Sequence, residues 1–331
     1  MRKLIAVTSV LMVLAVPSWA DTEKAIVALP AENFAFLPFY VAQEKHFFED
    51  QGLTVQKVVL PGVGTTNGVI SGAVNFGFSN GASLTRAAAR GQKLLAIALM
   101  SDKPVWSIML RKEVAEAAHF DPKAPLAERA KALTKAHGLA IDTVNSVGHG
   151  LMRVVEKMGG IDPESIQTTP LLSSDAISAF TRGAIDGFVA NPPWTEQILI
   201  TGTAVEIVSS LDGDPPWLTP FGSGVVVTQP QFCADHRSIC MKMGHALVVA
   251  MTYVHEHQAE SLAVMREHFP QMDAKVAERS FAVIEKSMPK TPIVVEEAIS
   301  NSDRLNVEAG FMKPDEKLTS YKELFTDEFV R

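Results

Sequence analysis

The stretch of sequence that decides the fold is residues 25–60, which read AIVALPAENFAFLPFYVAQEKHFFEDQGLTVQKVVL. It begins with a short apolar run, Ala25–Leu29, which has the length of a buried strand. Residues on one face then recur three or four apart over Pro38–Gln51, which predicts a helix that ends at Gly52. Val55–Leu60 alternates in polarity, as a half-buried strand does. The stretch therefore predicts a strand, a helix and a second strand in succession.

The same alternation continues along the chain and then starts again. A strand at Val74–Phe78 is followed by a helix at Ser83–Arg90, and a second series runs from Trp106–Leu110 to Asp186–Ala190. Repeated units of this kind imply mainly parallel sheets with helices on both faces. We therefore predict an α/β protein with two doubly wound lobes. After Gly224–Thr228 the sequence predicts a helical C-terminal tail, with helices at Met241–His268, Asp273–Ser287, Val294–Asn306 and Asp315–Phe325.

The composition excludes several classes of protein. The chain has 331 residues, of which 47% are apolar and 20% charged, so it is too apolar to be disordered. Two Cys residues are too few for a miniprotein that is held together by disulfides. A formal net charge of -7 argues against a protein that binds nucleic acid. The length fits two lobes of roughly 150 residues each.

The first twenty residues have the layout of a secretory signal. Arg2 and Lys3 form a short positive start, Leu4–Val16 is an apolar run of 13 residues, and small residues follow at Ser18 and Ala20. A membrane anchor is the alternative, but a bilayer core needs about 20 residues. We expect cleavage after Ala20 and a soluble periplasmic protein. Lipid attachment is not expected, because no Cys lies near the cleavage site.

Export would bring Cys233 and Cys240 into an oxidising compartment. On one straight helix their separation would give a rise of about 10.5 Å, which is beyond the limit of roughly 7 Å for a disulfide. A disulfide therefore needs a bend between them, for example where Asp235 or Ser238 caps a new helix. A structural disulfide and two buried free thiols are equally compatible with the sequence.

The segment Gly77–Gly81, GFSNG, matches the G-x-S-x-G turn of serine hydrolases and lies between a predicted strand and a predicted helix. The alternative is a turn whose Ser79 hydroxyl and backbone N–H groups face a ligand. A hydrolase also needs an acid and a histidine at later strand ends. The late histidines all fall in or at the end of one predicted helix, which favours the ligand-facing turn: His245, His255, His257 and His268.

Two loops with small and hydroxyl residues precede predicted helices, one in each lobe. Residues 62–68, GVGTTNG, lack the Lys of a Walker phosphate loop, and residues 145–149 read NSVGH. Free N–H groups at such helix starts can hold an anion or a polar ligand. His149 either donates to an anionic ligand or is a surface loop histidine. We expect no metal and no cofactor, because His255 and His257 lack the spacing of a metal-binding pair.

Aromatic residues gather where predicted strands end, among Gly, Pro and Asn. We assign Phe39 to the core. The others lie where ligands bind in open α/β sheets, so we expect a cleft with apolar walls and a few polar groups. They are Phe34, Phe36, Trp106, Trp194, Trp217 and Phe221.

Three segments carry a resemblance to a known family. Residues 36–53, FLPFYVAQEKHFFEDQGL, closely resemble the opening of the sulfonate-binding and thiamine-pyrimidine-precursor-binding proteins of ABC importers. Residues 70–78, ISGAVNFGF, are similar to the next element of that family, and residues 179–187, AFTRGAIDG, to its counterpart in the second lobe. The similarity runs in order from about Ala25 to Asn191.

The resemblance implies a type II periplasmic binding protein with two hinge crossovers near Trp106 and Gly224. Residues 21–105 plus 224–331 would form the first lobe, and residues 106–223 the second. Such a protein is not an enzyme but captures a small solute and delivers it to the permease and ATPase subunits of an importer. We expect a monomer. The family binds nitrate, taurine, alkyl or aromatic sulfonates, pyrimidines and related small organic molecules.

The resemblance also implies the ligand loops, which would be Asn33–Leu37, Gly64–Thr66, Ser79–Gly81, Ser146–His149 and Asn191–Trp194. None of the implied loops carries an Arg, which favours a flat, partly aromatic organic acid over a bare inorganic anion. Pro192 stands where family members often carry an acidic residue, which argues against recognition of an amino group there. The rival class is an exported enzyme on the same fold, such as a hydrolase that uses Ser79. The expected ligand-binding residues are Asn33, Phe34, Phe36, Leu37, Gly64, Thr65, Thr66, Ser79, Asn80, Trp106, Ser146, Gly148, His149, Asn191, Trp194 and Phe221.

Overall fold

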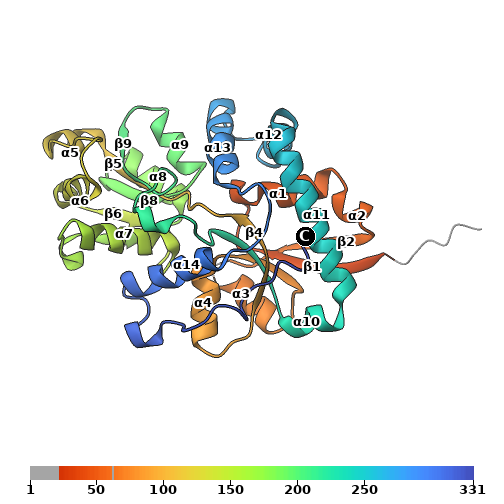
Figure 1. The fold of residues 1–331 in the computed structure, drawn as a ribbon. Helices are drawn as coiled ribbons and strands as arrows, with labels where there is room; N and C mark the ends of the chain where they lie inside the picture. The colour runs from red at the N-terminus through yellow and green to blue at the C-terminus, as the bar shows by residue number, and fades with distance from the viewer. Residues whose placement is uncertain (1–21, 62) are drawn as a thin grey trace, which may run out of the picture.

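The computed structural model describes residues 22–61 and 63–331, and they form two five-stranded sheets (Figure 1). The first sheet has the order β2-β1-β3-β10-β4. Strands β1, β2 and β3 are parallel, and β10 lies antiparallel between β3 and β4. Its strands are β1 (Glu23–Leu29), β2 (Leu53–Val59), β3 (Phe76–Ser79), β4 (Leu95–Ser101) and β10 (Gly224–Thr228).

The second sheet repeats this plan with the order β7-β6-β8-β5-β9. Strands β6, β7 and β8 are parallel, and β5 lies antiparallel between β8 and β9. In each sheet the antiparallel strand is the first one that the chain forms after it arrives from the other sheet. The strands are β5 (Ser107–Arg111), β6 (Leu139–Ile141), β7 (Thr168–Pro170), β8 (Gly187–Ala190) and β9 (Ala204–Ser209). We call the part of the chain around each sheet a lobe.

The chain passes between the sheets twice, from Ser101 to Ser107 and from Ser209 to Gly224. The backbone N–H of Trp106 donates to Ser210 Oγ (2.9 Å), and that of Ser210 donates to the Trp106 carbonyl (3.0 Å). These bonds tie the two crossovers together at a side chain that is fully buried. The lobe boundaries predicted from the sequence fall within the first connection and at the end of the second.

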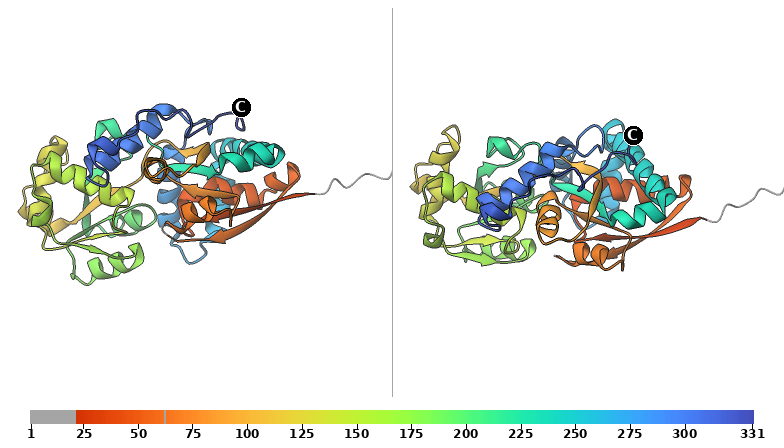
Figure 2. Two further views of the ribbon diagram at one scale, coloured as in Figure 1. Left: turned by 90° about the horizontal axis from the view of Figure 1, so that it is seen from below. Right: turned by 60° about the horizontal axis from the view of Figure 1, so that its bottom comes forward.

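Helices cover both faces of each sheet, as the pattern of repeated units predicts. In the first lobe they are α1 (Leu37–Glu44), α2 (Phe47–Asp50), α3 (Gly64–Ile70), α4 (Gly81–Ala89), α10 (Pro230–Asp235), α11 (Arg237–Glu256), α12 (Gln258–His268) and α13 (Ala274–Ser287). In the second they are α5 (Lys112–Ala117), α6 (Leu126–Ala130), α7 (Val147–Met158), α8 (Ser173–Thr181) and α9 (Trp194–Leu199). Helix α14 (Glu296–Glu308) lies where the two lobes meet and contacts both α4 and α7 (Figure 2).

The structure corrects three of the predicted helices. The helix expected over Met241–His268 is divided into α11 and α12 at His257, whose ψ of 55° is not helical. The helix expected over Pro38–Gln51 is divided into α1 and α2 at His46, whose φ of 59° is left-handed. The helix expected over Asp315–Phe325 is absent beyond a short turn at Pro314–Glu316. The tail instead bonds to strand β4, because the Ala96 N–H donates to the Leu324 carbonyl (2.8 Å). An edge strand offers unpaired backbone groups, and these outweigh the helical spacing of the tail.

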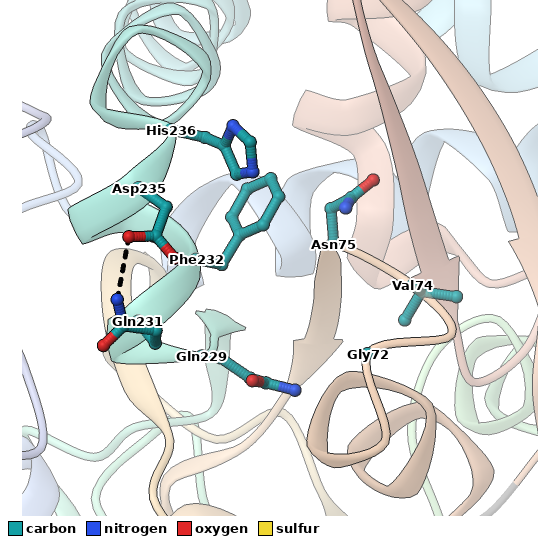
Figure 3. A pocket seen from close by; sticks show the side chains of 8 residues that line it. All are labelled: Gly72, Val74, Asn75, Gln229, Gln231, Phe232, Asp235 and His236. Atoms are coloured by element: carbon teal, nitrogen blue, oxygen red, sulfur yellow. Dashed lines mark hydrogen bonds between the residues drawn. The ribbon is translucent and has the colours of Figure 1, made fainter.

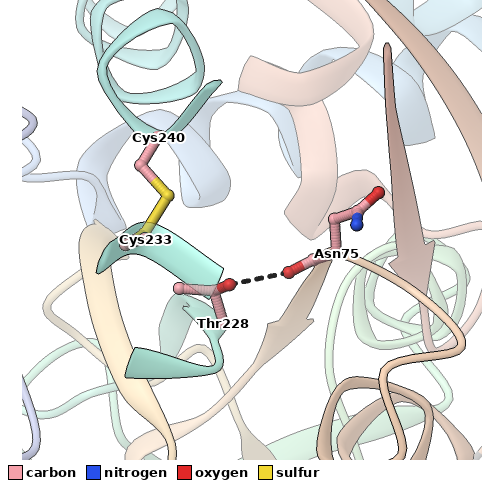
Figure 4. The surroundings of a disulfide bond; sticks show 4 residues. All are labelled: Asn75, Thr228, Cys233 and Cys240. Carbon is pink, nitrogen blue, oxygen red and sulfur yellow. Dashed lines mark hydrogen bonds between the residues drawn. A yellow bond between two sulfur atoms is a disulfide. The ribbon is translucent and has the colours of Figure 1, made fainter. Parts of the chain in front are cut away.

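The structure joins Cys233 and Cys240 by a disulfide with a Cα–Cα distance of 5.7 Å (Figure 4). Helix α10 ends at Asp235, and α11 begins at Arg237 after a non-helical His236. This break supplies the bend that a straight helix lacks. The predicted secretory signal lies outside the described residues. Within the described residues, none of the helices combines the length and the apolar character needed to cross a membrane.

Candidate functional site

The predicted ligand residues lie at the carboxyl ends of parallel strands in both sheets. In the first lobe, Asn33 and Phe36 follow β1, Thr66 follows β2, and Ser79 ends β3. In the second lobe, residues 145–149 follow β6, and residues 191–194 follow β8. These ends are where open α/β sheets bind ligands, because helix N-termini and loops converge there.

Two hydroxyl groups meet in the first lobe. Thr66 Oγ1 and Ser79 Oγ are 3.3 Å apart, and both side chains are half-buried. A Cβ on Gly77 would lie 2.7 Å from Thr65 Cγ2, so a glycine is needed for α3 to pack this close to β3. Thr65 itself is buried, and its Oγ1 donates to the Leu60 carbonyl (2.9 Å). Thr65 therefore holds the loop, while the other two hydroxyls remain accessible.

The loop after β1 contributes one aromatic side chain to this end of the sheet. Phe36 is half-buried and meets Phe78 edge-on, with ring centroids 5.6 Å apart. Phe34 and Leu37 have no exposed surface, and Phe34 packs on Phe269 at 4.5 Å. Their side chains belong to the core of the first lobe instead of facing a ligand. Asn33 caps the turn, because its Oδ1 accepts from the Ala35 N–H (2.9 Å).

The starts of α4 and α7 are both capped by their own side chains. Asn80 Oδ1 accepts from the Ser83 N–H (2.8 Å), and Ser146 Oγ accepts from the His149 N–H (3.0 Å). Each cap uses one of the N–H groups that were predicted to be free to bind a ligand. Ser146 Oγ also donates to Asp142 Oδ1 (2.6 Å). An anion at the start of α7 would therefore meet a carboxyl group, although burial raises the pKa of Asp142.

His149 is buried, so the alternative of a surface loop histidine is wrong. Its Nδ1 accepts from the Asn145 N–H (2.9 Å), and its ring lies 5.2 Å from that of Phe311. Burial, and then the nearby Arg153, lower the pKa of His149. The neutral form is favoured, and its Nδ1 is already an acceptor within the protein. His149 therefore positions the loop and does not offer a cationic contact.

Aromatic residues of the crossovers divide between the core and the strand ends. Trp106 is half-buried and lies against the start of α7, where a Cβ on Gly148 would be 2.6 Å from its ring. Phe221 is fully buried in the core of the second lobe. Asn191 and Trp194 are half-buried at the end of β8, and the Trp194 N–H donates to the Asn191 carbonyl (3.1 Å).

An ion pair that the sequence did not predict lies beside the loop at residues 191–194. Glu196 lies two residues after Trp194, and its Oε2 is 2.5 Å from Nε of Arg279 on α13. Only 8% of the Glu196 side chain is exposed. The partners belong to different lobes, so no local pattern in the sequence could have brought them together.

The Ser79 hydroxyl has none of the partners that a catalytic serine needs. Within the described part of the chain its hydrogen-bond partner is Thr66, and no histidine is bonded to it. The late histidines lie beside other groups: His255 Nδ1 is 2.8 Å from Glu285 Oε1, and His268 Nε2 is 3.1 Å from Glu44 Oε1. Across residues 22–61 and 63–331, no group of three or more His, Cys, Asp or Glu could hold a metal ion.

Two pockets lie away from these strand ends. One of about 210 Å³ is next to the disulfide, and Figure 3 shows Phe232 and Asn75 facing each other across it. The other, of about 550 Å³, lies beside the first crossover and is lined by Asp102, Lys103 and residues of α11 and α13. Neither pocket contains any of the predicted ligand residues.

Comparisons with known proteins agree with the predicted resemblance. Residues 33–120 match the family model described as NMT1/THI5 like, which confirms the resemblance for that segment. None of the curated proteins matches the chain in sequence.

Several solved structures share the fold. A protein of Bordetella bronchiseptica RB50 is 16% identical, covers 93% of this chain and 96% of its own, and has a TM-score of 0.78. The alkanesulfonate-binding protein SsuA of Xanthomonas axonopodis pv. citri, bound to MOPS, is 16% identical with coverages of 93% and 100% and a TM-score of 0.71. The periplasmic nitrate-binding protein NrtA of Synechocystis PCC 6803 is 14% identical with coverages of 93% and 87% and a TM-score of 0.68. The predicted two-lobed periplasmic binding protein fold is therefore confirmed.

Proposed function

We propose that this chain, whose residues 33–120 match the NMT1/THI5-like family, is the solute-binding component of an ABC importer. The observation that carries the proposal is the matched placement of loops at the carboxyl ends of parallel strands in two sheets. The sheets are linked by two crossovers, about which the lobes can close on a solute and bury it. A permease would then recognise the surface that closure creates.

The accessible side chains suggest the class of solute. In the first lobe the hydroxyl groups of Thr66 and Ser79 meet, and Phe36 is half-buried against Phe78. In the second lobe Trp106 and Trp194 are half-buried. Ring faces suit a flat ligand, and hydroxyl groups can donate to its polar atoms. The predicted ligand loops contain no Arg or Lys. We therefore favour an aromatic sulfonate, a carboxylate or a pyrimidine over a bare inorganic anion.

The partners and the location follow from the same proposal. The layout of the first twenty residues supports export to the periplasm with cleavage after Ala20. The mature protein would act as a monomer, with residues 21–105 plus 224–331 as one lobe and residues 106–223 as the other. Its partners would be a small solute and the permease and ATPase subunits of the importer. No catalytic role is proposed, since Ser79 bonds to a second hydroxyl and not to a base.

Calorimetric titration with nitrate, taurine, benzenesulfonate, benzoate and cytosine tests the proposal. We expect an aromatic acid or the pyrimidine to bind and nitrate not to bind. Replacing both Thr66→Val and Ser79→Ala should weaken binding about tenfold, because two hydroxyl donors are lost. Thr54→Val is the matched control, since Thr54 is exposed at the opposite end of β2. Tight nitrate binding with none for the aromatic acids would overturn the choice of solute.

Native mass spectrometry of the freshly purified protein adds an independent test, because it weighs any solute that co-purifies. An enzyme would instead turn its ligand over. A measured hydrolysis that Ser79→Ala abolishes would favour the hydrolase over the binding protein.

A further inference from the structure

Helix α13 of the first lobe presents two positive charges to the second lobe. Arg279 Nε is 2.5 Å from Glu196 Oε2, and Lys286 Nζ is 2.7 Å from Asp212 Oδ1. Arg279 and Lys286 are two helical turns apart and therefore share one face of α13. Glu196 belongs to α9, and Asp212 to the connection after β9. Two ion pairs thus connect α13 to this side of the second lobe.

The two ion pairs differ in their distance from the crossovers. The end of α13 near Lys286 is fixed to the first crossover, because the Ser287 carbonyl accepts from the Asp102 N–H (3.1 Å) and from Ser101 Oγ (3.2 Å). Arg279 lies about 10 Å further along the helix axis. A rotation of the lobes about the crossovers therefore moves Arg279 away from its partner further than it moves Lys286.

The two ion pairs also differ in burial. The Glu196 side chain is 8% exposed, whereas that of Asp212 is 60% exposed. Burying a carboxylate costs free energy unless a cation compensates it. Glu206 adds a further acid near Glu196, with its Oε1 accepting from Ser107 Oγ (2.5 Å). Arg279 is therefore the group that makes the contact between α9 and α13 favourable.

We propose that the Arg279–Glu196 pair is an inter-lobe latch that holds the lobes together and is released when they separate. The proposal rests on the proposed function, in which the lobes open and close around a solute. Glu196 lies in the first turn of α9, directly after the predicted ligand loop at residues 191–194. The strength of the latch thus sets the ratio of open to closed protein, and with it the apparent affinity for solute.

The experiment measures the distance between the lobes in solute-free protein by pulsed electron spin resonance. Spin labels are attached at Val63→Cys and Leu172→Cys, whose side chains are both 71% exposed. These positions follow the edge strands β2 and β7, which lie farthest from the crossover strands in their sheets. The native cysteines are joined in a disulfide and do not compete for the label.

We expect Arg279→Gln to raise the ratio of open to closed protein about tenfold, the effect of losing a cation beside a buried carboxylate. Sodium chloride should shift the unmodified protein in the same direction. The charge exchange Arg279→Glu with Glu196→Arg should restore the original distances. Arg279 is 47% exposed, so its replacement is compatible with folding.

Lys157→Gln is the matched control. It removes a third ion pair, Lys157 Nζ to Glu308 Oε2 (2.6 Å), on the side of α14. We expect Lys157→Gln to leave the distance between the two spin labels unchanged. The latch is overturned if Arg279→Gln leaves the distances unchanged, or if Lys157→Gln changes them equally. Failure of the solute titrations together with opening in Arg279→Gln would refute the proposed function and leave the latch standing.

Discussion

The two helices that join the lobes, α13 and α14, differ in how far apolar side chains contribute to their contacts. Helix α14 contributes to the cores of both lobes: Ala298 and Ile299 pack in the first, and Leu305 packs in the second. Asn306, which is fully buried, donates from Nδ2 to the Ala82 carbonyl (2.9 Å). Helix α13 instead reaches the second lobe through the charged side chains of Arg279 and Lys286.

The contact of α14 is also the tighter one. A Cβ on Gly81 would overlap Ser302 Oγ, and one on Gly222 would lie 3.1 Å from Cα of Gly81. The backbones of α4 and the second crossover therefore approach α14 as closely as side chains allow. Separating such surfaces opens cavities, whereas separated ion pairs regain water. From this difference we predict that the lobes rotate about the α14 side and part on the α13 side.

The largest predicted effect concerns the apolar contact. Leu305→Ala should lower the free energy of unfolding by about 3 kcal/mol, because it leaves a cavity where α14 enters the second core. Urea denaturation followed by circular dichroism measures the loss. Val295→Ala, at a side chain that is 41% exposed just before α14, should change stability by less than about 0.5 kcal/mol. Equal losses in both variants would contradict the difference drawn between the two contacts.

A smaller loss is expected where the first crossover meets α7. Gly148→Ala places a methyl group 2.6 Å from the Trp106 ring, and such overpacking costs about 2 kcal/mol. Thermal unfolding reports the loss. Gly138→Ala serves as the control, because no atom lies within 4 Å of its added Cβ. If Gly148→Ala were as stable as this control, the Trp106 ring would not be tightly packed against α7.

The smallest predicted effect on stability concerns Glu206, an acidic residue near Glu196 of the latch. Burial, and then repulsion by Asp212, Glu196 and Asp214, raise the pKa of Glu206, although a hydrogen bond from Ser107 opposes them. A raised pKa in the folded protein means that stability falls as the pH rises from the unfolded pKa through the folded one. Glu206→Gln should therefore stabilise the protein at pH 7.5 by on the order of 1 kcal/mol.

The gain from Glu206→Gln should disappear near pH 4, where the carboxyl group of the unmodified protein is protonated. Urea denaturation at both pH values checks this. A variant that is equally or less stable at pH 7.5 would show that the Glu206 carboxylate is well compensated.

Local patterns were sufficient for most strands and helices. The strands predicted at Ala25–Leu29 and Trp106–Leu110 correspond to β1 and β5, and the helix predicted at Ser83–Arg90 corresponds to α4. These segments are short, and their periodicity reports burial directly. The helix expected at Asp315–Phe325 does not form, because the tail bonds to the backbone of β4 instead. A local stretch of sequence cannot show this long-range contact.

The sequence was sufficient to place the predicted ligand residues at strand ends, but not to predict the orientation of each side chain. Thr66 and Ser79 come together as the loops imply, whereas Phe34, Leu37 and Phe221 turn into the cores. Residue type alone does not show whether a Phe packs in the core or faces a ligand, since a Phe beside a strand end is stabilised by either contact. Burial decides between them, and burial depends on the neighbouring helices.

The sequence by itself determined most elements of both lobes and the order of the predicted ligand loops, because these depend on spacing within a few residues. Only the tertiary structure decided which side chains meet across the lobes. Arg279 and Glu196 are 83 residues apart in sequence, and Gly148 meets Trp106 only because α7 packs against the first crossover. The energies of such contacts depend on distance and burial in space, which neither composition nor periodicity encodes.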